Sequence, residues 1–312
     1  MMEPVELIAG ADVGGSKSRV VIATASGTTL ASATGPGAAM RPGEAEHCAA
    51  ILVAVVAAAL ADAGHAGHTP AVLCAGFAGV GREPERVALH DALARAGVAQ
   101  ETIVETDAAV VLADAFGTGA GILLVAGTGS IAFGRSPAGA TARVGGWGPM
   151  LGDEGSGTWI ARRALSAVTA AHDGREPETA LTGALLTAAQ VNDVDELVPW
   201  AAAADRDAVA ALAPSVLATA AQGDGRASAI VDMAVEELVL HVVALARQLF
   251  VDERASLDVA LAGGLLGRGS LLRKRLERRL RVATPGATIA AGEVDGARGA
   301  AAVAARALRA PR

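Results

Sequence analysis

The sequence predicts an α/β protein built from two similar halves, each a sheet flanked by helices. Short apolar runs alternate with longer helical patterns along most of the chain, which is typical of this class. The same outline of strand, glycine turn and strand occurs twice, at 7–24 and at 123–135. A length of 312 residues is also more than one core usually needs. Because open α/β sheets bind ligands beyond the ends of their strands, we expect a ligand cleft between the halves.

The first half is predicted to begin with three strands joined by glycine turns and to continue with alternating helices and strands. The helix after the third strand ends at "GHAGHTP", where glycine and proline stop it. The strand that follows is a short apolar run, which is typical of a buried strand. The expected elements are strands at 6–11, 19–24 and 28–33, a helix at 44–63, a strand at 71–77, a helix at 84–96, a strand at 102–105 and a helix at 107–115.

The second half repeats the three-strand opening and then becomes mainly helical. The expected elements are strands at 121–126, 130–134 and 141–145, helices from 157 to 250, a strand at 257–262, a basic helix at 268–281 and a last helix at 296–308. We place the boundary near Gly117–Gly119. This gives an N-terminal domain of residues 1–117 and a C-terminal domain of residues 118–312 with extra helices, of which the last could return to the N-terminal domain.

The composition argues against nucleic-acid and membrane partners. Only 2% of residues are aromatic and the formal charge is −7, whereas nucleic acids attract basic and stacking side chains. The longest apolar run, 48–61, is shorter than the roughly 20 residues of a membrane span, and is predicted to be a buried helix. An acidic start and two distant cysteines, Cys48 and Cys74, predict a cytoplasmic protein without a secretory signal or a disulfide framework.

A glycine turn, "DVGGSKS" at 12–18, follows the first apolar strand. Its glycines let backbone N–H groups approach an anion closely, and Lys17 adds a positive charge. Asp12, at the end of the strand, could hold Mg²⁺, which prefers oxygen ligands. The alternative is an ordinary hairpin turn with a surface lysine.

A second glycine turn, "GTGS" at 127–130, takes the same place in the second half. One such turn is weak evidence for a ligand. Two turns at matching places predict that each half contributes one turn to the grip on a single polyphosphate.

Asp107 follows the strand "TIVE" and begins a helix. Aspartate is a good helix N-cap, which is the structural interpretation. At the presumed cleft, a carboxylate could instead accept the proton of an attacking hydroxyl group.

Paired glycines also end a later strand, in "LAGGLL" at 261–266. They would allow close approach of a nucleobase or ribose. A tight corner between strand and helix also explains them, and on the residues alone we favour that explanation.

The most informative segment is "GGWGPMLGDEGSGTWIARRAL" at 145–165. Clustered glycines lose much entropy on folding, so they usually occur where the backbone needs a conformation or a close contact that other residues do not allow. Asp153 and Glu154 can accept hydrogen bonds from a polyol, and Trp147 can cover a sugar face. The alternative is a long loop in which Ser156 or Thr158 caps the next helix.

In these motifs the sequence resembles the N-acetylglucosamine kinase branch of the BadF/BadG/BcrA/BcrD-type ATPases, within the actin-like and hexokinase-like superfamily. The resemblance covers nearly the whole chain, in the order "DVGGSKSR", "FAGV", "ETDA", "AGTGS", "GGWGPMLGDEGSG", "LAGGLL" and "DGARGAAAVA". It implies two ribonuclease-H-like domains of the actin-like ATPase type, with an interdomain cleft that holds Mg²⁺, ATP and a sugar. It also implies an ATP-dependent sugar kinase that phosphorylates an amino sugar such as N-acetylglucosamine or glucosamine at O6.

The resemblance assigns a role to each motif. ATP would be bound by Gly14, Gly15, Ser16, Lys17, Thr128, Gly129, Gly223, Gly263 and Gly264. The sugar would be bound by Asp107, Ser130, Gly146, Trp147, Gly148 and Asp153. Asp107 would be the catalytic base, and Asp12 would hold Mg²⁺ through water. Relatives are commonly dimers, so a homodimer is an expected assembly.

Two positions depart from the family pattern. Ala38 or Ala39 and Ile131 stand where relatives use substrate-binding asparagines, which removes hydrogen bonds to the substrate. Two other functions stay open at this point. One is an ATPase that activates an acyl-CoA dehydratase or reductase, and the other is a sugar-binding regulator without catalysis.

Overall fold

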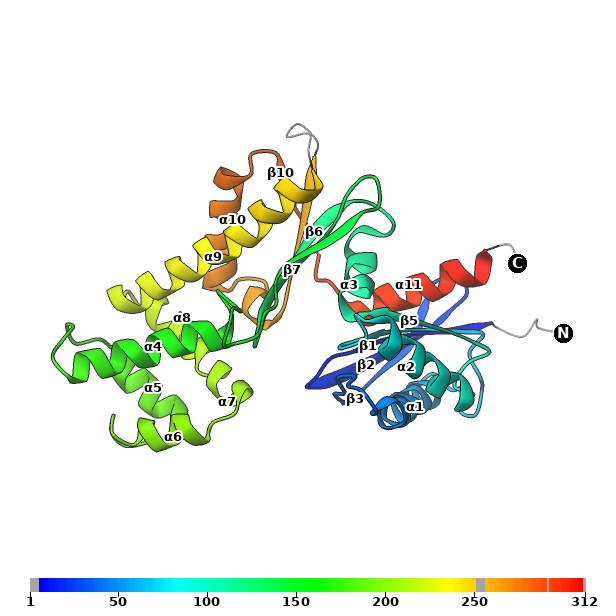
Figure 1. The fold of residues 1–312 in the computed structure, drawn as a ribbon, viewed down its shortest axis with the longest axis horizontal. Helices are drawn as coiled ribbons and strands as arrows, with labels where there is room; N and C mark the ends of the chain where they lie inside the picture. Colours follow the sequence, from blue (N-terminus) through cyan, green and yellow to red (C-terminus); the bar gives the residue numbers. More distant parts are fainter. Residues whose placement is uncertain (1–5, 251–255, 291, 311–312) are drawn as a thin grey trace. The chain divides into compact units, whose positions relative to one another are not determined.

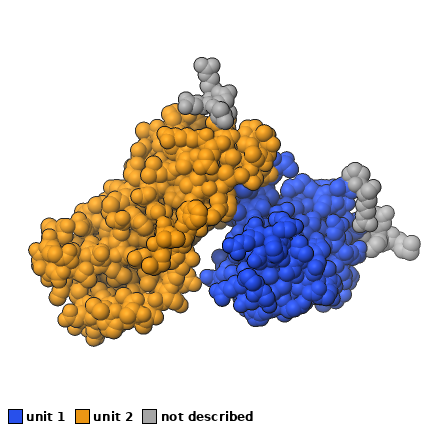
Figure 2. Space-filling view, in the orientation of Figure 1, with its two compact units in different colours: residues 1–119, 294–312 blue, residues 120–293 orange. Residues whose placement is uncertain are grey.

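The computed structural model describes residues 6–250, 256–290 and 292–310. The chain forms two compact units, Met1–Gly119 with Val294–Arg312 and Ala120–Glu293, which Figure 2 shows in different colours. The chain passes from the first unit to the second after residue 119. The sequence analysis placed this boundary after residue 117. The sequence assigned the last helix to the C-terminal domain and allowed that it could return to the N-terminal one; in the structure α11 (Gly296–Arg309) packs in the first unit.

The first unit contains a five-stranded mixed sheet with helices on both faces. Its elements are β1 (Leu7–Val13), β2 (Lys17–Thr24), β3 (Thr29–Pro36), α1 (Ala45–Asp62), β4 (Val72–Phe77), α2 (Glu83–Arg95), β5 (Glu101–Thr106), α3 (Asp107–Phe116) and α11 (Gly296–Arg309). The strand order is β3-β2-β1-β4-β5, with β1, β4 and β5 parallel and the β1–β2 and β2–β3 pairs antiparallel. Helices α1 and α2 cover one face, and α3 and α11 cover the other (Figure 1).

Side-chain alternation along β1 decides which residues face each layer. Leu7, Ala9 and Ala11 pack in the core beneath α1, whereas Ile8 packs with α11. Because successive side chains point to opposite faces of a strand, Gly10 and Asp12 share the α11 face with Ile8. The polar end of β1 therefore lies against the first turn of α11.

Helix α11 approaches β1 and α3 so closely that only glycine fits at the contacts. A Cβ at Gly10 would overlap backbone atoms of Ala297 and Ala301, and a Cβ at Gly299 would overlap the carbonyl of Val110. The buried face of α11 consists of alanine and glycine, which allows this close backbone approach. This packing explains why the last helix belongs to the first unit.

We expect the substitution Gly10→Ala to lower the free energy of unfolding by about 1–3 kcal/mol, because the added methyl group overpacks the contact with α11. Gly183→Ala is the matched control, since Gly183 lies in α5 (Leu181–Ala189) and a Cβ there meets no atom within 4 Å. The control is expected to be neutral or to stabilise by about 0.5–1 kcal/mol. Urea unfolding of both variants checks this, and equal stability of Gly10→Ala and the parent would contradict the packing.

The second unit repeats the sheet plan of the first and adds a helical layer. Its elements are β6 (Gly121–Ala126), β7 (Ser130–Arg135), β8 (Thr141–Gly145), α4 (Gly157–His172), α5, α6 (Leu197–Ala203), α7 (Arg206–Ala210), α8 (Ala213–Ala221), α9 (Gly225–Leu249), β9 (Leu257–Ala262), a 3-10 turn (Gly264–Leu266), α10 (Leu271–Ala283) and β10 (Ala287–Ile289). The strand order β10-β9-β6-β7-β8 again places two antiparallel strands on one side of a central strand and two parallel strands on the other. The prediction of two similar α/β halves is confirmed.

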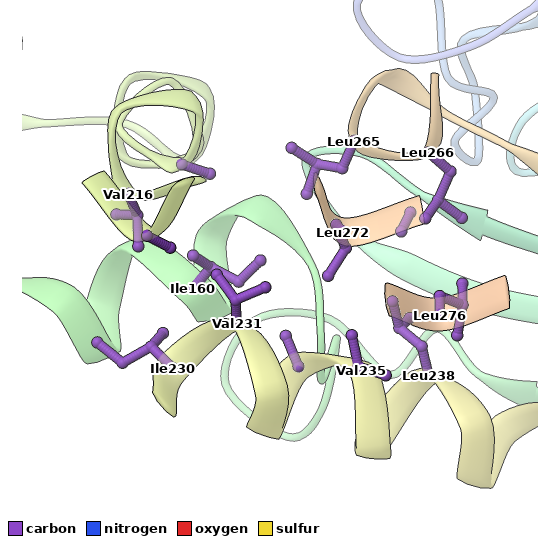
Figure 3. Packing of buried hydrophobic residues seen from close by; sticks show 14 of the residues in the cluster. Ile160, Val216, Ile230, Val231, Val235, Leu238, Leu265, Leu266, Leu272 and Leu276 are labelled. Atoms are coloured by element: carbon purple, nitrogen blue, oxygen red, sulfur yellow. The ribbon is translucent and has the colours of Figure 1, made fainter. Parts of the chain in front are cut away.

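The core of the second unit is built around α9 (Figure 3). Val231, Val235 and Leu238 recur at spacings of four and three residues, so they form one apolar stripe on this helix. They pack with Ile160 of α4 and with Leu276 of α10 in one continuous cluster. This cluster supports α4, the first helix after the turn at 127–130.

Helix α1 has the length and composition of a membrane span, with a mean hydropathy of 1.7. Its Leu52 and Val56 nevertheless pack in the core of the first unit, against the strands that α1 covers. The expected buried helix is thus present, with one face in the core.

Candidate functional site

The first glycine turn, Gly14–Ser16, connects β1 to β2 in the first unit. The Gly14 N–H donates to the Lys17 carbonyl (3.0 Å), and the Ala38 N–H donates to the Gly14 carbonyl (3.0 Å). Gly37 packs directly on this turn, because a Cβ there would overlap backbone atoms of residues 15–17. The turn is therefore held in place from behind, while residues 15–17 are exposed.

Ser18 lies outside this turn. Its side chain is fully buried on the α1 side of the sheet, near Gly35 and Val55. The motif "DVGGSKS" at 12–18 included Ser18 in the turn, and strand alternation places its side chain on the opposite face from Asp12 instead.

Two carboxylates, those of Asp107 and Asp295, interact electrostatically with Asp12 in the first unit. The pKa of Asp12 is raised to about 6, first by burial and then by the negative charges of Asp107 and Asp295, while Lys17 lowers it. Asp107 stands at the end of β5, and Asp295 is the N-cap of α11. Asp12 consequently lies beside two further negative charges that Lys17 and Arg19 offset in part, an arrangement that favours a bound cation.

Asp107 is the first residue of α3, and the helix cap is its neighbour. The Thr106 side chain accepts from the Ala109 N–H (3.2 Å), whereas Asp107 Oδ1 accepts from the Ala108 N–H (2.8 Å). Burial raises the pKa of Asp107, and the hydrogen bond from Ala108 partly opposes this shift. The N-cap interpretation of Asp107 is therefore wrong, and the carboxylate is available for another task.

The donor set in the first unit fits Mg²⁺ held through water. Among the described residues, no group of three or more His, Cys, Asp or Glu side chains could enclose a metal ion. Mg²⁺ usually keeps several waters and binds through one or two carboxylates together with substrate phosphates. Asp12, a hard oxygen ligand whose raised pKa reflects burial and nearby negative charge, meets that requirement.

The second glycine turn, Gly127–Gly129, connects β6 to β7 and is held by the start of α4. The Gly127 N–H donates to the Gly129 carbonyl (2.9 Å). The Gly157 N–H donates to the Gly127 carbonyl (2.8 Å), and the Thr158 hydroxyl donates to the Thr128 carbonyl (2.8 Å). This arrangement fixes a glycine turn beside a helix N-terminus, a combination suited to binding phosphate.

The segment 145–155 folds back on the second turn. The Gly146 N–H donates to the Ser130 carbonyl (3.0 Å), and the Ser130 hydroxyl donates to the Glu154 carbonyl (2.6 Å). Ser156 caps α4 by accepting from the Trp159 N–H (3.2 Å), which confirms one of the two caps considered from the sequence. Ser130 and the glycine segment are thus neighbours in the same unit.

Trp147 and Asp153 behave differently within this segment. Trp147 is 64% exposed, and the Arg143 guanidinium lies 4.8 Å from its ring centroid. Asp153 is buried and has a φ of 60°. This backbone conformation is unfavourable for residues other than glycine, and such residues are often found at functional sites. Its Oδ1 accepts from the Gly148 N–H (3.3 Å).

Arg206 pairs with Asp153, a contact that the sequence did not reveal. Its Nη2 lies 2.5 Å from Asp153 Oδ2, although 53 positions separate the two residues. A side chain at Gly129 would overlap both groups. Gly129 therefore lets the second turn lie against this ion pair, and nothing in the alanine-rich sequence around Arg206 signals the contact.

Three of the glycines that the resemblance assigns to ATP have different local environments. Gly223 has a φ of 97° and follows the C-cap of α8, which is a usual place for glycine. Gly263 has a φ of 94°, and a Cβ there would overlap the backbone of Ala126, as expected for a tight corner. A Cβ at Gly264 would meet no atom within 4 Å, so protein contacts leave room beside this glycine.

A second unforeseen network fixes α11 to α3. Asp114 Oδ2 accepts from the Asp295 N–H (2.8 Å), and the two carboxylate oxygens accept from Arg298 Nε and Nη2 (2.6 Å each). Asp295 in turn pairs with Arg19 (3.3 Å). This network holds the first turn of α11 beside Asp12, where only glycine fits at position 296.

The apolar residues that replace the family's asparagines make apolar or backbone contacts in the structure. Ala38 is buried beneath the first turn. Ile131 packs against Gly146, where a Cβ would overlap its side chain. Neither side chain can replace the hydrogen bonds of an asparagine.

Curated relatives match the chain over nearly its full length. An N-acetylmuramic acid/N-acetylglucosamine kinase of Clostridium acetobutylicum is 28% identical over 94% of this chain and 96% of its own. An N-acetyl-D-glucosamine kinase of Dictyostelium discoideum is 29% identical over 95% of this chain and 97% of its own.

Solved structures are similar as well. A candidate N-acetylglucosamine kinase of Chromobacterium violaceum is 31% identical, with a TM-score of 0.78 over 95% of this chain and 98% of its own. A glucokinase of the ROK family from Streptomyces griseus shares the fold, with a TM-score of 0.61 at 17% identity over 96% of this chain and 99% of its own. The family model described as the BadF/BadG/BcrA/BcrD ATPase family matches residues 9–304. The chain therefore belongs to the BadF/BadG/BcrA/BcrD ATPase family.

Proposed function

We propose that this protein, an ATP-dependent carbohydrate kinase, transfers the γ-phosphate of ATP to O6 of an amino sugar such as N-acetylglucosamine or glucosamine. The proposal rests on the placement of Asp107. It is a half-buried carboxylate with a raised pKa at the end of β5, and the Asp12 carboxylate lies close enough for the two charges to interact. The kinase activities named for the relatives support the same reaction class.

In the proposed reaction Asp107 accepts the proton of the attacking sugar hydroxyl. A base works best when its pKa lies near the working pH, so the upward shift caused by burial makes this carboxylate a better acceptor than an exposed one. The main part of catalysis is positioning and charge neutralisation, as in phosphoryl transfer generally. Mg²⁺, when bound, supplies positive charge to the phosphates of ATP.

The other residues bind and orient the two substrates. The phosphates of ATP are assigned to Gly14–Lys17, Thr128 and Gly129, and adenosine is assigned to Gly223, Gly263 and Gly264. Asp12 holds Mg²⁺ through water. The sugar is assigned to Asp107, Ser130, Gly146, Trp147, Gly148 and Asp153. The ion pair with Arg206 supports this sugar assignment, because it orients the buried Asp153 carboxylate.

The two cysteines argue against the alternative of an activator with an iron–sulfur cluster. Cys48 lies in the core on the α1 side of the sheet, and Cys74 lies in the core on the α11 side. Burial raises the pKa of Cys74 to about 12, so this thiol resists forming the thiolate that a cluster needs. No observation favours this second function.

The decisive experiment is a coupled assay of ADP release with glucosamine, N-acetylglucosamine, N-acetylmannosamine, N-acetylmuramic acid and glucose. We expect at least one amino sugar to raise ADP release more than tenfold above the rate without sugar. The 6-deoxy form of that sugar tests the hydroxyl, and is expected to give only the background rate. Background release with every sugar would reject the kinase proposal in favour of a silent sugar-binding regulator.

A further inference from the structure

The second unit contains a groove whose lining includes Asp153 but no residue of the turn Gly127–Gly129. It has a volume of about 820 Å³ and is bounded by α4, the start of α9 and the loop Pro149–Glu154. This volume lies in the range of small-molecule sites. One wall of the groove is the loop that carries Asp153, a proposed sugar residue.

The groove brings four arginines together in an otherwise acidic chain, beside three carboxylates, those of Asp153, Glu154 and Glu176. Four arginines line it, namely Arg162, Arg163, Arg175 and Arg226. Two of these are neutralised, because Arg175 pairs with Asp173 (2.9 Å) and Arg226 pairs with Glu176 (3.1 Å). Over the part of the chain that the structure describes, no carboxylate lies within ion-pair distance of the other two.

Both of these uncompensated arginines are held in place by neutral partners. Arg162 Nη1 donates to the Pro149 carbonyl (2.8 Å), and the Arg163 guanidinium lies 4.3 Å from the ring centroid of Trp159. Each contact orders a long side chain without neutralising its charge. An ordered guanidinium with donors to spare is well suited to a phosphate, which it can bind through paired hydrogen bonds.

The rest of the lining is mixed. Ser166 and Glu154 can bond hydroxyl groups, while Met150 and Met233 offer apolar contact. We propose that this groove is a second ligand site, which binds a phosphorylated sugar through Arg162 and Arg163. The proposal does not depend on the kinase reaction, because binding can be measured without ATP.

The test is isothermal titration calorimetry with glucosamine 6-phosphate, on the full chain without nucleotide. The variant Arg162→Gln/Arg163→Gln removes both uncompensated charges, and we expect its affinity to be at least tenfold weaker. Lys274→Gln/Arg278→Gln is the matched control, since it removes the same charge from exposed positions of α10 in the same unit, and we expect less than a twofold change. Unchanged affinity in the groove variant, or an equal loss in both variants, would overturn the proposal.

A fluorescence measurement reports on the groove itself and needs no arginine variant. In a chain with Trp147→Phe and Trp200→Phe, the remaining Trp159 lies beneath Arg163. Glucosamine 6-phosphate is expected to change its emission, inorganic phosphate to compete at higher concentration, and glucosamine alone to have no effect. An unresponsive Trp159, or an equal response to glucosamine, would also reject the site.

Discussion

Asp107→Asn is expected to lower kcat for the best sugar by about 10²–10⁴, the usual contribution of a general base. Asparagine keeps the size of the side chain, but its amide cannot accept the proton of the sugar hydroxyl. The helix should still form, because Thr106 provides the cap of α3. ATP affinity is expected to stay within about threefold, because the proposed role of Asp107 lies with the sugar hydroxyl.

Steady-state kinetics and nucleotide titration of the same preparation check this expectation. Asp91→Asn is the matched control, because it makes the same chemical change at an exposed position of α2 in the same unit. The control should keep the turnover of the parent. A kcat of Asp107→Asn within threefold of the parent would remove Asp107 from the role of base.

Asp12→Asn is expected to have opposite effects on activity and stability. Removing the carboxylate assigned to Mg²⁺ should lower turnover by about a hundredfold or more, since a metal ion supplies several kcal/mol of charge stabilisation. The same change should raise the free energy of unfolding by about 1–3 kcal/mol at pH 8 without Mg²⁺. The reason is that the folded protein disfavours the ionised form of this half-buried side chain.

The stability effect has a defined pH dependence. The pKa of Asp12 rises from 3.8 to about 6 on folding, so the folded state binds the proton more tightly than the unfolded state. The contribution of Asp12 to stability is therefore fully present below pH 4 and is lost as the pH rises through 6. Asparagine mimics the protonated carboxyl, so the difference between variant and parent should be near zero at pH 4 and reach its maximum above pH 7.

Chemical unfolding in EDTA from pH 4 to pH 8 checks this difference. Asp62→Asn is the matched control, because it makes the same chemical change at an exposed position at the end of α1, and it is expected to change the free energy of unfolding by less than about 0.5 kcal/mol. A variant that is less stable than the parent at pH 8 would show that the Asp12 carboxylate is compensated in the folded protein.

The sequence predicted the features that depend on neighbouring residues. Strand alternation, glycine turns and helix ends are local, and the strands and helices expected in the described residues are present within a few positions. The 3-10 turn Gly264–Leu266 and the short strand β10 were missed, because three residues are too few to show a period. Ser18 was wrongly included in the turn, because a turn motif does not tell which side chains return to the strand.

By itself, the sequence determined the doubled plan of strand, glycine turn and strand, with Asp12 and Asp107 at strand ends. Only the tertiary structure decided that Arg206 holds Asp153, that Asp114 and Arg298 fix α11 to α3, and that residues 294–312 belong to the first unit. The physical reason is separation along the chain. A local pattern specifies which face of an element is buried, but the partner at that face is selected by complementary packing and charge once the whole chain has folded.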